Sequence, residues 1–132
     1  MPPAQAETGS MSAVLVVDDN DQLRTMVRRM LELRGHAVTT ASDGKQATRQ
    51  LIAGPVPDLV ITDLIMPEQE GIETIEIIRE RFPTVKIIAM SGGGRVLDYL
   101  PNAAAMGAHQ TLSKPFSAEE LHLAVAAALA DE

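Results

Sequence analysis

The stretch Ala13-Val14-Leu15-Val16-Val17-Asp18-Asp19 decides the fold class, because five aliphatic residues in a row stop at two acids. A short, continuous aliphatic run is typical of a strand buried on both faces, as in parallel sheets covered by helices. An amphipathic stretch of helical period begins directly after the acids. The stretch therefore predicts a strand and helix unit with two carboxylates at the carboxyl end of the strand.

Four more runs of strand length follow along the chain, at 36–40, 58–62, 85–90 and 109–112. The runs at 58–62 and 85–90 are nearly continuous in aliphatic residues, which predicts central strands. The runs at 36–40 and 109–112 are more polar, which favours the edges of the sheet. Longer amphipathic stretches alternate with these runs. The sequence therefore predicts an α/β fold built on a five-stranded, doubly wound parallel sheet.

The first helix is predicted from apolar residues that recur at helical spacing before Gly35, namely Leu23, Met26, Val27, Met30 and Leu31. The last helix is predicted at about 117–130. It begins with Ser117 and has Glu120 three residues later, which is the spacing of a capping box. A local signal thus marks the end of the first helix and the start of the last helix.

Three further helices are predicted between these two. One runs over 44–53 and a second over 72–82, each ending beside a proline. The third is predicted near 95–106, where Pro101 lacks the amide hydrogen that a continuous helix needs. We therefore expect a kink or a late start in this helix.

The composition fits one compact cytoplasmic domain. The chain has 132 residues, so we expect 1–12 to be a mobile tail and 13–132 to form a single domain. Its 11 basic and 18 acidic residues give a net charge of −7, which disfavours direct binding to nucleic acid or to an anionic membrane. The absence of cysteine excludes disulfides, thiolate zinc sites and a cysteine nucleophile. No run of about 18 apolar residues predicts a membrane span.

Chemically active side chains follow four of the five predicted strands: Asp18 and Asp19, then Asp63, Ser91 and Lys114. In an open parallel sheet the carboxyl ends of the strands meet at one edge, where ligands bind. Each of these residues has an ordinary structural explanation, such as a helix cap or a turn. Capping does not explain why three acids and one lysine would gather at the same edge, so the set indicates a functional site.

Three carboxylates held together repel one another unless a cation lies between them. Oxygen ligands without cysteine or histidine favour Mg²⁺. Three carboxylates and one lysine carry −2, which one Mg²⁺ neutralises, and such a site can stabilise charge on a transferred phosphoryl group. The sequence therefore predicts a magnesium site suited to phosphoryl chemistry.

The residues at this edge make the chain resemble the receiver domain of two-component response regulators over about 12–130. The motifs that carry the resemblance are Asp18-Asp19, Asp63-Leu64-Ile65-Met66-Pro67 with Gly71, Ser91-Gly92, and Lys114-Pro115-Phe116. The resemblance implies a flavodoxin-like (βα)5 fold with strand order 2-1-3-4-5. It also implies a phosphorelay protein in signal transduction.

By this resemblance Asp63 is the phosphoacceptor, which takes a phosphoryl group from a sensor histidine kinase or a histidine phosphotransfer protein. Asp18 and Asp19 would hold Mg²⁺ together with Asp63 and the backbone carbonyl of Ile65. The chain would thus be a signalling phosphoprotein that carries an aspartyl phosphate, and not an enzyme acting on a separate substrate.

The resemblance also assigns the remaining residues of the edge. Lys114 would pair with the aspartate and then with the phosphoryl group, and Ser91 would donate a hydrogen bond to it. The bond between Lys114 and Pro115 is expected to be cis. Where the family usually has an aromatic switch residue, this chain has Thr111, so we expect switching to depend on Ser91 and on the glycines that begin at Gly92.

Ile65 is apolar where residues that assist hydrolysis often lie, which predicts slow self-dephosphorylation. A homodimer or an effector would bind the face formed by 95–106, 109–112 and 117–130. Arg24, Arg28 and Arg29 offer a docking surface for the kinase, although a solvated helix face also explains them.

Two other functions are consistent with parts of the sequence. A pseudo-receiver would use the same fold as a binding module without phosphorylation. A small serine hydrolase would use Ser91 with Asp98 and His109, which follow in the chain order of a nucleophile-elbow enzyme. The hydrolase pattern is incomplete because Ala89 replaces its first glycine.

Overall fold

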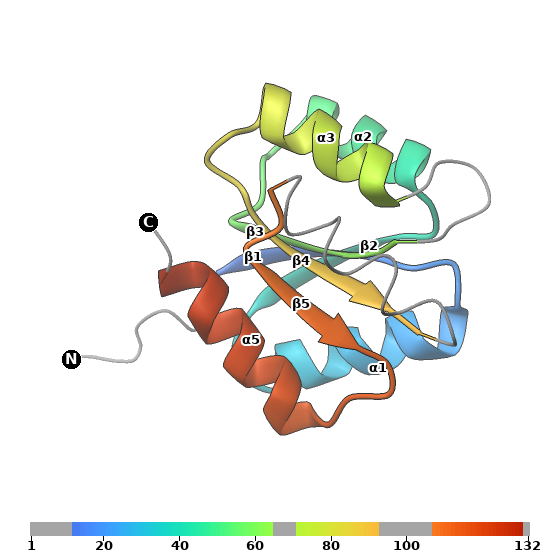
Figure 1. Ribbon diagram of the computed structural model, residues 1–132, viewed down its shortest axis with the longest axis vertical. Coiled ribbons are helices and arrows are strands. Elements are labelled where there is room, and N and C mark those ends of the chain that lie inside the picture. Colours follow the sequence, from blue (N-terminus) through green and yellow to red (C-terminus); the bar gives the residue numbers. More distant parts are fainter. Residues whose placement is uncertain (1–11, 65–70, 93–106, 131–132) are drawn as a thin grey trace.

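The computed structural model describes residues 12–64, 71–92 and 107–130, which form a five-stranded parallel sheet between helices (Figure 1). The strand order is β2-β1-β3-β4-β5, which confirms the predicted fold class and order. The two more polar runs are the edge strands, as their composition predicted. The strands are β1 (Ala13–Val17), β2 (Ala37–Ala41), β3 (Leu59–Asp63), β4 (Lys86–Ser91) and β5 (Gln110–Ser113).

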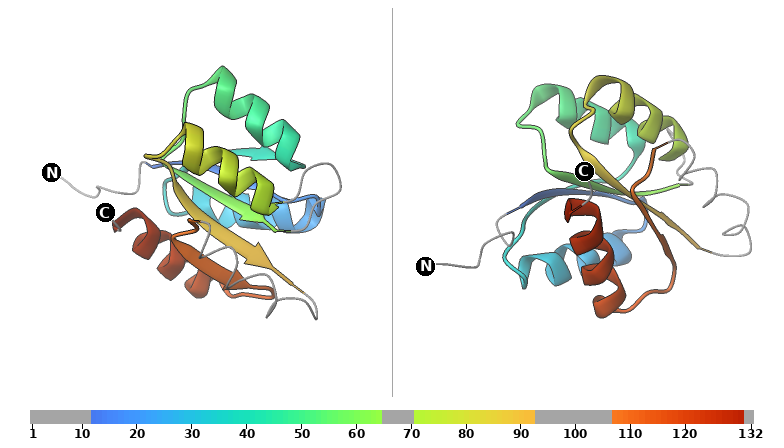
Figure 2. Two further views of the ribbon diagram at one scale, coloured as in Figure 1. Left: turned by 45° about the horizontal axis from the view of Figure 1, so that its top comes forward. Right: turned by 60° about the vertical axis from the view of Figure 1, so that its left-hand side comes forward.

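Helices cover both faces of the sheet (Figures 1 and 2). They are α1 (Asp21–Glu32), α2 (Gly44–Ala53), α3 (Gly71–Arg81) and α5 (Ala118–Ala130). The helices α2 and α3 lie on one face, and α1 and α5 lie on the other. The predicted helix near 95–106 lies outside the described residues, and so does 1–11 of the predicted tail. No helix of the described ranges is long and apolar enough to cross a membrane.

The aliphatic run of β1 supplies both halves of the core. Leu15 and Val17 pack in the cluster that lies under α2 and α3. Val14 and Val16 point to the other face and pack in the cluster under α1 and α5. Successive side chains of a strand point to opposite faces, so a continuous aliphatic run is needed when both faces are covered.

The strands β2 to β5 each begin and end one residue later than predicted, whereas β1 has its predicted bounds. Asp63 is the last residue of β3 and pairs in register with Met90 of β4. Ser91 is likewise the last residue of β4 and pairs with Ser113. Strand ends are set by ladder pairing with distant residues, which local hydrophobicity does not reveal. The shift places both side chains inside the sheet edge and not in the loops beyond it.

Side-chain caps begin both the first and the last helix, and the cap at Ser117 confirms the start signal predicted for the last helix. The Asn20 side chain accepts from Leu23 N at 3.0 Å and caps α1. At α5, Ser117 Oγ accepts from Glu120 N at 3.0 Å while Glu120 Oε1 accepts from Ser117 N at 2.8 Å, the reciprocal pattern of a capping box. Such caps satisfy amide groups that the helix itself leaves unpaired.

The first and last helices bury only part of their apolar residues. Met26 was predicted on the buried side of the first helix, but it is 41% exposed, and Val27 and Leu31 are the residues that α1 buries fully. The last helix reads as apolar nearly all round, yet Leu123 is 65% exposed while one face of α5 is buried. A single sheet face contacts only one stripe of each helix, so the remaining apolar residues stay in water.

A pair of isoleucine substitutions tests this assignment of the core. Ile61 in β3 is 0% exposed and Ile52 in α2 is 56% exposed. We expect Ile61→Ala to lower the free energy of unfolding by about 2–5 kcal/mol, because it removes buried methyl groups and leaves a cavity. The control Ile52→Ala is expected to change it by less than about 0.5 kcal/mol. Urea unfolding followed by circular dichroism measures both, and equal losses would contradict the assignment.

Candidate functional site

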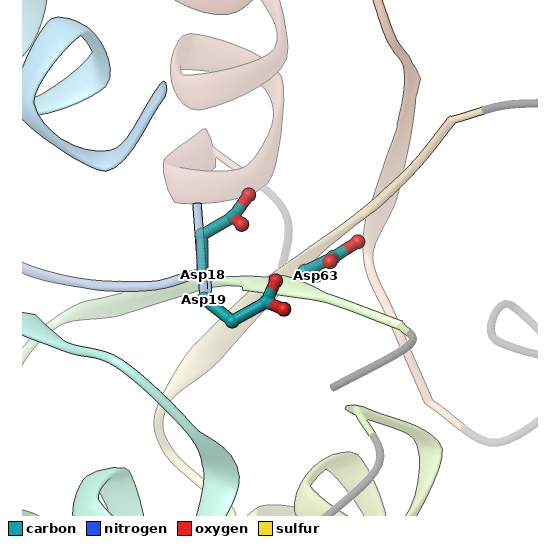
Figure 3. A group of neighbouring side chains, drawn as sticks. All are labelled: Asp18, Asp19 and Asp63. Atoms are coloured by element: carbon teal, nitrogen blue, oxygen red, sulfur yellow. The ribbon is translucent and has the colours of Figure 1, made fainter. Parts of the chain in front are cut away.

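Three aspartates meet at the carboxyl edge of the sheet (Figure 3). Asp18 and Asp19 directly follow β1, and Asp63 ends the neighbouring strand β3. Each offers one carboxylate oxygen, and these oxygens lie within 4.8 Å of one another. Asp18 is 0% exposed and Asp63 is 7% exposed, whereas Asp19 lies in solvent. The structure therefore brings together the acids that the sequence placed at this edge.

Lys114 supplies the positive charge of the cluster. Its Nζ lies 2.8 Å from Asp18 Oδ2 and 3.4 Å from Asp63 Oδ1. Its backbone N donates to Ser91 O at 2.7 Å, which extends the pairing of β4 and β5 beyond the end of β5. The peptide bond between Lys114 and Pro115 is cis, as predicted. The lysine is thus anchored by its own backbone while its ammonium contacts two buried carboxylates.

The backbone around Asp18 is fixed from three directions. Its N donates to Ala41 O at 3.1 Å, and its Oδ1 accepts from Asn20 N at 2.9 Å. Arg24 Nη1 donates to Asp18 O at 2.6 Å, and the same guanidinium is paired with Asp21. Each contact limits the movement of a carboxylate that must stay close to other acids.

Arg24 is a positioning residue that the sequence reasoning missed. Its guanidinium bridges the Asp18 carbonyl and the Asp21 side chain, which joins the end of β1 to the first turn of α1. The sequence analysis placed Arg24 with Arg28 and Arg29 as a docking surface. Its place one helical turn after a capping residue was the available signal, since a long side chain there can reach back to the loop.

The environment of Asp63 disfavours its ionised form. Burial, and to a smaller extent the negative charge of Asp18, raise the pKa of this carboxyl, which lies at about 6. The ammonium of Lys114 and the hydrogen bond from Leu64 N, at 3.0 Å to Asp63 Oδ1, act in the opposite direction. Burial and repulsion exceed these favourable contacts. A cation or an added covalent group at this carboxylate would therefore relieve an unfavourable arrangement.

Ser91 and two glycines shape the space around the cluster. Ser91 Oγ is buried and has no hydrogen-bond partner within the described residues. At Gly92, a Cβ would lie 3.1 Å from Lys114 Cβ, so a side chain there would press on the lysine. At Gly71, a Cβ would lie 2.0 Å from Asp63 O, which leaves room for hydrogen alone. The hydroxyl is a donor available to a further ligand.

The donor set fits a hard divalent cation. All three acidic side chains offer oxygen, which is the ligand type that Mg²⁺ binds, and no sulfur or imidazole is among them. Three carboxylates and one ammonium leave a formal charge of −2 that such an ion would balance. Ile65, whose backbone carbonyl the sequence analysis expected as a further ligand, lies outside the described residues.

The residues of the serine hydrolase hypothesis do not come together. Ser91 pairs with Ser113 at the carboxyl end of β5, whereas His109 precedes the start of β5. His109 Nδ1 instead accepts from Ile87 N at 3.0 Å, close to the beginning of β4. The third member, Asp98, lies outside the described residues. The hydrolase hypothesis was therefore wrong, because a parallel register separates the serine and the histidine by nearly the length of a strand.

The raised pKa of Asp63 predicts a defined pH dependence of stability. Between the ordinary value of 3.8 and about 6, the folded protein keeps a proton that the unfolded chain releases. The free energy of unfolding therefore falls as the pH rises through this window. In EDTA at pH 7.5, we expect Asp63→Asn to be more stable than the wild type by up to about 3 kcal/mol. Below pH 4 the difference should vanish.

Urea unfolding at several pH values measures this difference. The matched control is Asp19→Asn, which removes the same charge from an exposed position of the same cluster. Solvent screens an exposed charge, so the control should change stability less. A wild type that is as stable as Asp63→Asn at pH 7.5 would contradict the unfavourable environment of Asp63.

Comparison with known proteins gives one consistent result. The family model of the response regulator receiver domain matches residues 14–126. The chain is 35% identical over 120 residues to the DNA-binding transcriptional regulator NtrC of Azospirillum brasilense, covering 91% of this chain and 24% of that protein. It is 36% identical over 108 residues to the response regulator MprA of Mycolicibacterium vanbaalenii, covering 82% of this chain and 46% of that protein. The chain thus spans less than half the length of either relative.

Solved structures agree in fold and extent. A response regulator receiver domain protein from Clostridium thermocellum has a TM-score of 0.84 and 31% identity, covering 90% of this chain and 94% of that one. The response regulator protein TrrA from Thermotoga maritima, solved in complex with Mg(2+)-BeF, has a TM-score of 0.77 and 30% identity. The match covers 88% of this chain and 97% of that one. With its buried aspartate cluster and paired lysine, the chain belongs to the family of response regulator receiver domains.

Proposed function

We propose that Asp63 accepts a phosphoryl group from the phosphohistidine of a sensor histidine kinase or a histidine phosphotransfer protein. The observation that carries the proposal is the place of Asp63, buried between a second acid and an ammonium group. A carboxylate oxygen of Asp63 attacks the phosphorus, and the bond between phosphorus and the imidazole nitrogen breaks. That nitrogen keeps the bonding electrons and takes up a proton.

Asp18, Asp19 and Asp63 are proposed to hold Mg²⁺, together with the backbone carbonyl of Ile65. The ion supplies charge neutralisation for the oxygens of the transferred group. The oxygen-only donor set and the complex of TrrA with Mg(2+)-BeF support this choice of metal. In the metal-free protein, Lys114 balances part of the charge and keeps the acids in place.

Lys114 and Ser91 are proposed to bind the phosphoryl group once it is attached. The Lys114 ammonium, 3.4 Å from Asp63 Oδ1, needs only a short movement to pair with a phosphoryl oxygen on the same carboxylate. Ser91 Oγ is buried at the same edge and has a hydroxyl hydrogen to donate. Lys114 would stabilise the acyl phosphate through its positive charge, and Ser91 would stabilise it through a hydrogen bond.

The signal is proposed to leave the site through β4 and the segment beyond it. Thr111 occupies the place of the usual aromatic switch and is exposed on β5. Ser91 and Gly92 contact Lys114 directly, so they are the residues that phosphorylation would move first. Identical amide chemical shifts at Gly92 and 107–112 in the free and phosphorylated protein would contradict this route. A homodimer or an effector would bind the face of 95–106, β5 and α5.

The kinase is proposed to dock on α1. This helix begins at Asp21, two residues after Asp19, and carries a cavity of about 530 Å³ whose lining includes Met26, Arg29, Met30 and Leu33. Apolar side chains beside a basic one at the edge of the site suit a helical partner that must bring a histidine to Asp63.

As further proposals, 13–132 forms the receiver domain, 1–12 is a tail, and the protein acts in the cytoplasm.

Phosphorylation of the purified protein tests the function without its kinase. With acetyl phosphate and Mg²⁺, we expect intact mass spectrometry to show a gain of one phosphoryl group. The gain should be absent from Asp63→Asn and retained in Asp58→Asn, which changes an aspartate at the other end of β3. After removal of the donor, the modified fraction should decay slowly, because Ile65 gives water no polar side chain to bind.

Two outcomes would contradict the proposal. An unmodified protein that also takes no phosphoryl group from phosphorylated histidine kinases would favour a pseudo-receiver, which binds partners through the fold alone. A phosphoryl group that remains on Asp63→Asn would place the acceptor elsewhere.

A further inference from the structure

A second cavity lies at the opposite end of the molecule from the aspartates. It has a volume of about 540 Å³ and lies between α5 and the turn that joins α1 to β2. The turn contributes Arg34 and His36, and α5 contributes His122 from its first half. Figures 1 and 2 show α1 and α5 on the same face of the sheet, with the last turns of α5 running away from the carboxyl edge. The cavity is therefore separate from the phosphoryl site.

The polar lining of this cavity is basic. Arg34 is close enough to lower the pKa of both imidazoles through its charge, after burial, which is the larger cause for each. The charge of His36 lowers the pKa of His122 as well. His36 Nδ1 is buried and has no hydrogen-bond partner within the described residues. In a chain whose net charge is −7, this cavity has a positive charge at Arg34 and two imidazoles that gain one at lower pH.

The side of the cavity formed by α5 is apolar beyond His122. It consists of side chains from successive turns of α5, among them Val125, Ala126 and Leu129. Val125 also packs in the core, which holds this wall in place. A basic group of residues beside an aliphatic stripe matches a ligand that has a negative charge at one end and a hydrocarbon chain at the other. A metal cation fits poorly, because the Arg34 guanidinium cannot give up its charge.

We propose that this cavity binds a small amphipathic carboxylate, with its head at Arg34, His36 and His122 and its hydrocarbon body along Val125, Ala126 and Leu129. The guanidinium offers two parallel donors to a carboxylate, and a neutral or protonated imidazole adds a third. The aliphatic wall contributes by removing the ligand's methylene groups from water. This inference does not rest on phosphorylation of Asp63.

Titration of the full chain with octanoate tests the proposal directly. We expect proton–nitrogen and proton–carbon correlation spectra to show saturable shifts at the rings of His36 and His122 and at the amides of α5. Acetate has the same carboxylate without the hydrocarbon chain and should bind at least about tenfold more weakly. Inorganic phosphate, an anion without a hydrocarbon chain, should also bind weakly. Phosphate that binds more tightly than octanoate would overturn the carboxylate assignment.

Charge variants test which groups hold the head. Arg34→Gln and His122→Gln should each raise the dissociation constant of octanoate by about three- to tenfold. The matched control is Arg49→Gln, which removes one positive charge from α2 on the other face of the sheet and should leave binding unchanged. Equal weakening in all three variants would show that only net charge matters and would overturn the site.

The pH dependence of octanoate binding distinguishes recognition of the carboxylate by the imidazoles from simple apolar contact. The charged groups that act on the imidazoles are Arg34 on both and His36 on His122, and a bound carboxylate favours the protonated ring. Octanoate should therefore bind more tightly at pH 6 than at pH 8, and this difference should shrink in His122→Gln. An affinity that is independent of pH in both proteins would overturn the role of the imidazoles.

One further variant tests whether the chain's own acids use the site. Asp131 and Glu132 follow Ala130 in the sequence and lie outside the described residues. We expect the double variant Asp131→Asn, Glu132→Gln to bind octanoate as the unchanged chain does. Binding that is detected only in the double variant would overturn the proposal, because the cavity would then serve the acidic end of this chain.

Discussion

The contact of Lys114 with Asp18 and Asp63 is the constraint on which the arrangement of the site depends. These three residues come from the ends of β1, β3 and β5, and their charged atoms lie within 2.8–3.4 Å. The two buried carboxylates offer oxygens that lie within 4.8 Å of each other, and they would repel each other without a cation. The ammonium makes the metal-free fold tolerable, yet it does not fully compensate, because burial and Asp18 still raise the pKa of Asp63 to about 6. This environment suits the cation and the phosphoryl group that are proposed to bind at Asp63.

The parallel sheet makes this contact possible. Its register brings the ends of β1 and β3 side by side, and β4 carries Ser91 to the same edge while β5 ends just before Lys114. The helices then fix the loops: Arg24 of α1 holds the Asp18 carbonyl, and Gly71 at the start of α3 approaches Asp63 so closely that no side chain fits. Stability and function therefore share the same contacts at this edge. At the other end, the sheet and α5 leave a basic cavity that none of these contacts requires.

Local patterns in the sequence predicted the fold class, the strand order through a family resemblance, and the residues of the aspartate cluster. They placed β3 one residue early, because ladder pairing of Asp63 with Met90 cannot be read from hydrophobicity. They also gave Met26 to the core, since helical spacing alone does not say how wide the contact stripe is. Arg24 and the grouping of His36 with His122 were missed for a related reason. Both depend on which distant segments the fold brings together, and scattered residues carry no spacing signal.

The ionised form of Asp63 is unfavourable in the metal-free protein, and a bound cation would stabilise it. Carbon-13 NMR of the Asp63 side-chain carboxyl, titrated with pH in EDTA and again in Mg²⁺, measures this directly. The structure predicts a midpoint near pH 6 without metal, since the pKa of Asp63 is raised to about 6, and a clearly lower midpoint when Mg²⁺ is present. A midpoint close to the ordinary 3.8 in EDTA, unchanged by Mg²⁺, would contradict the account.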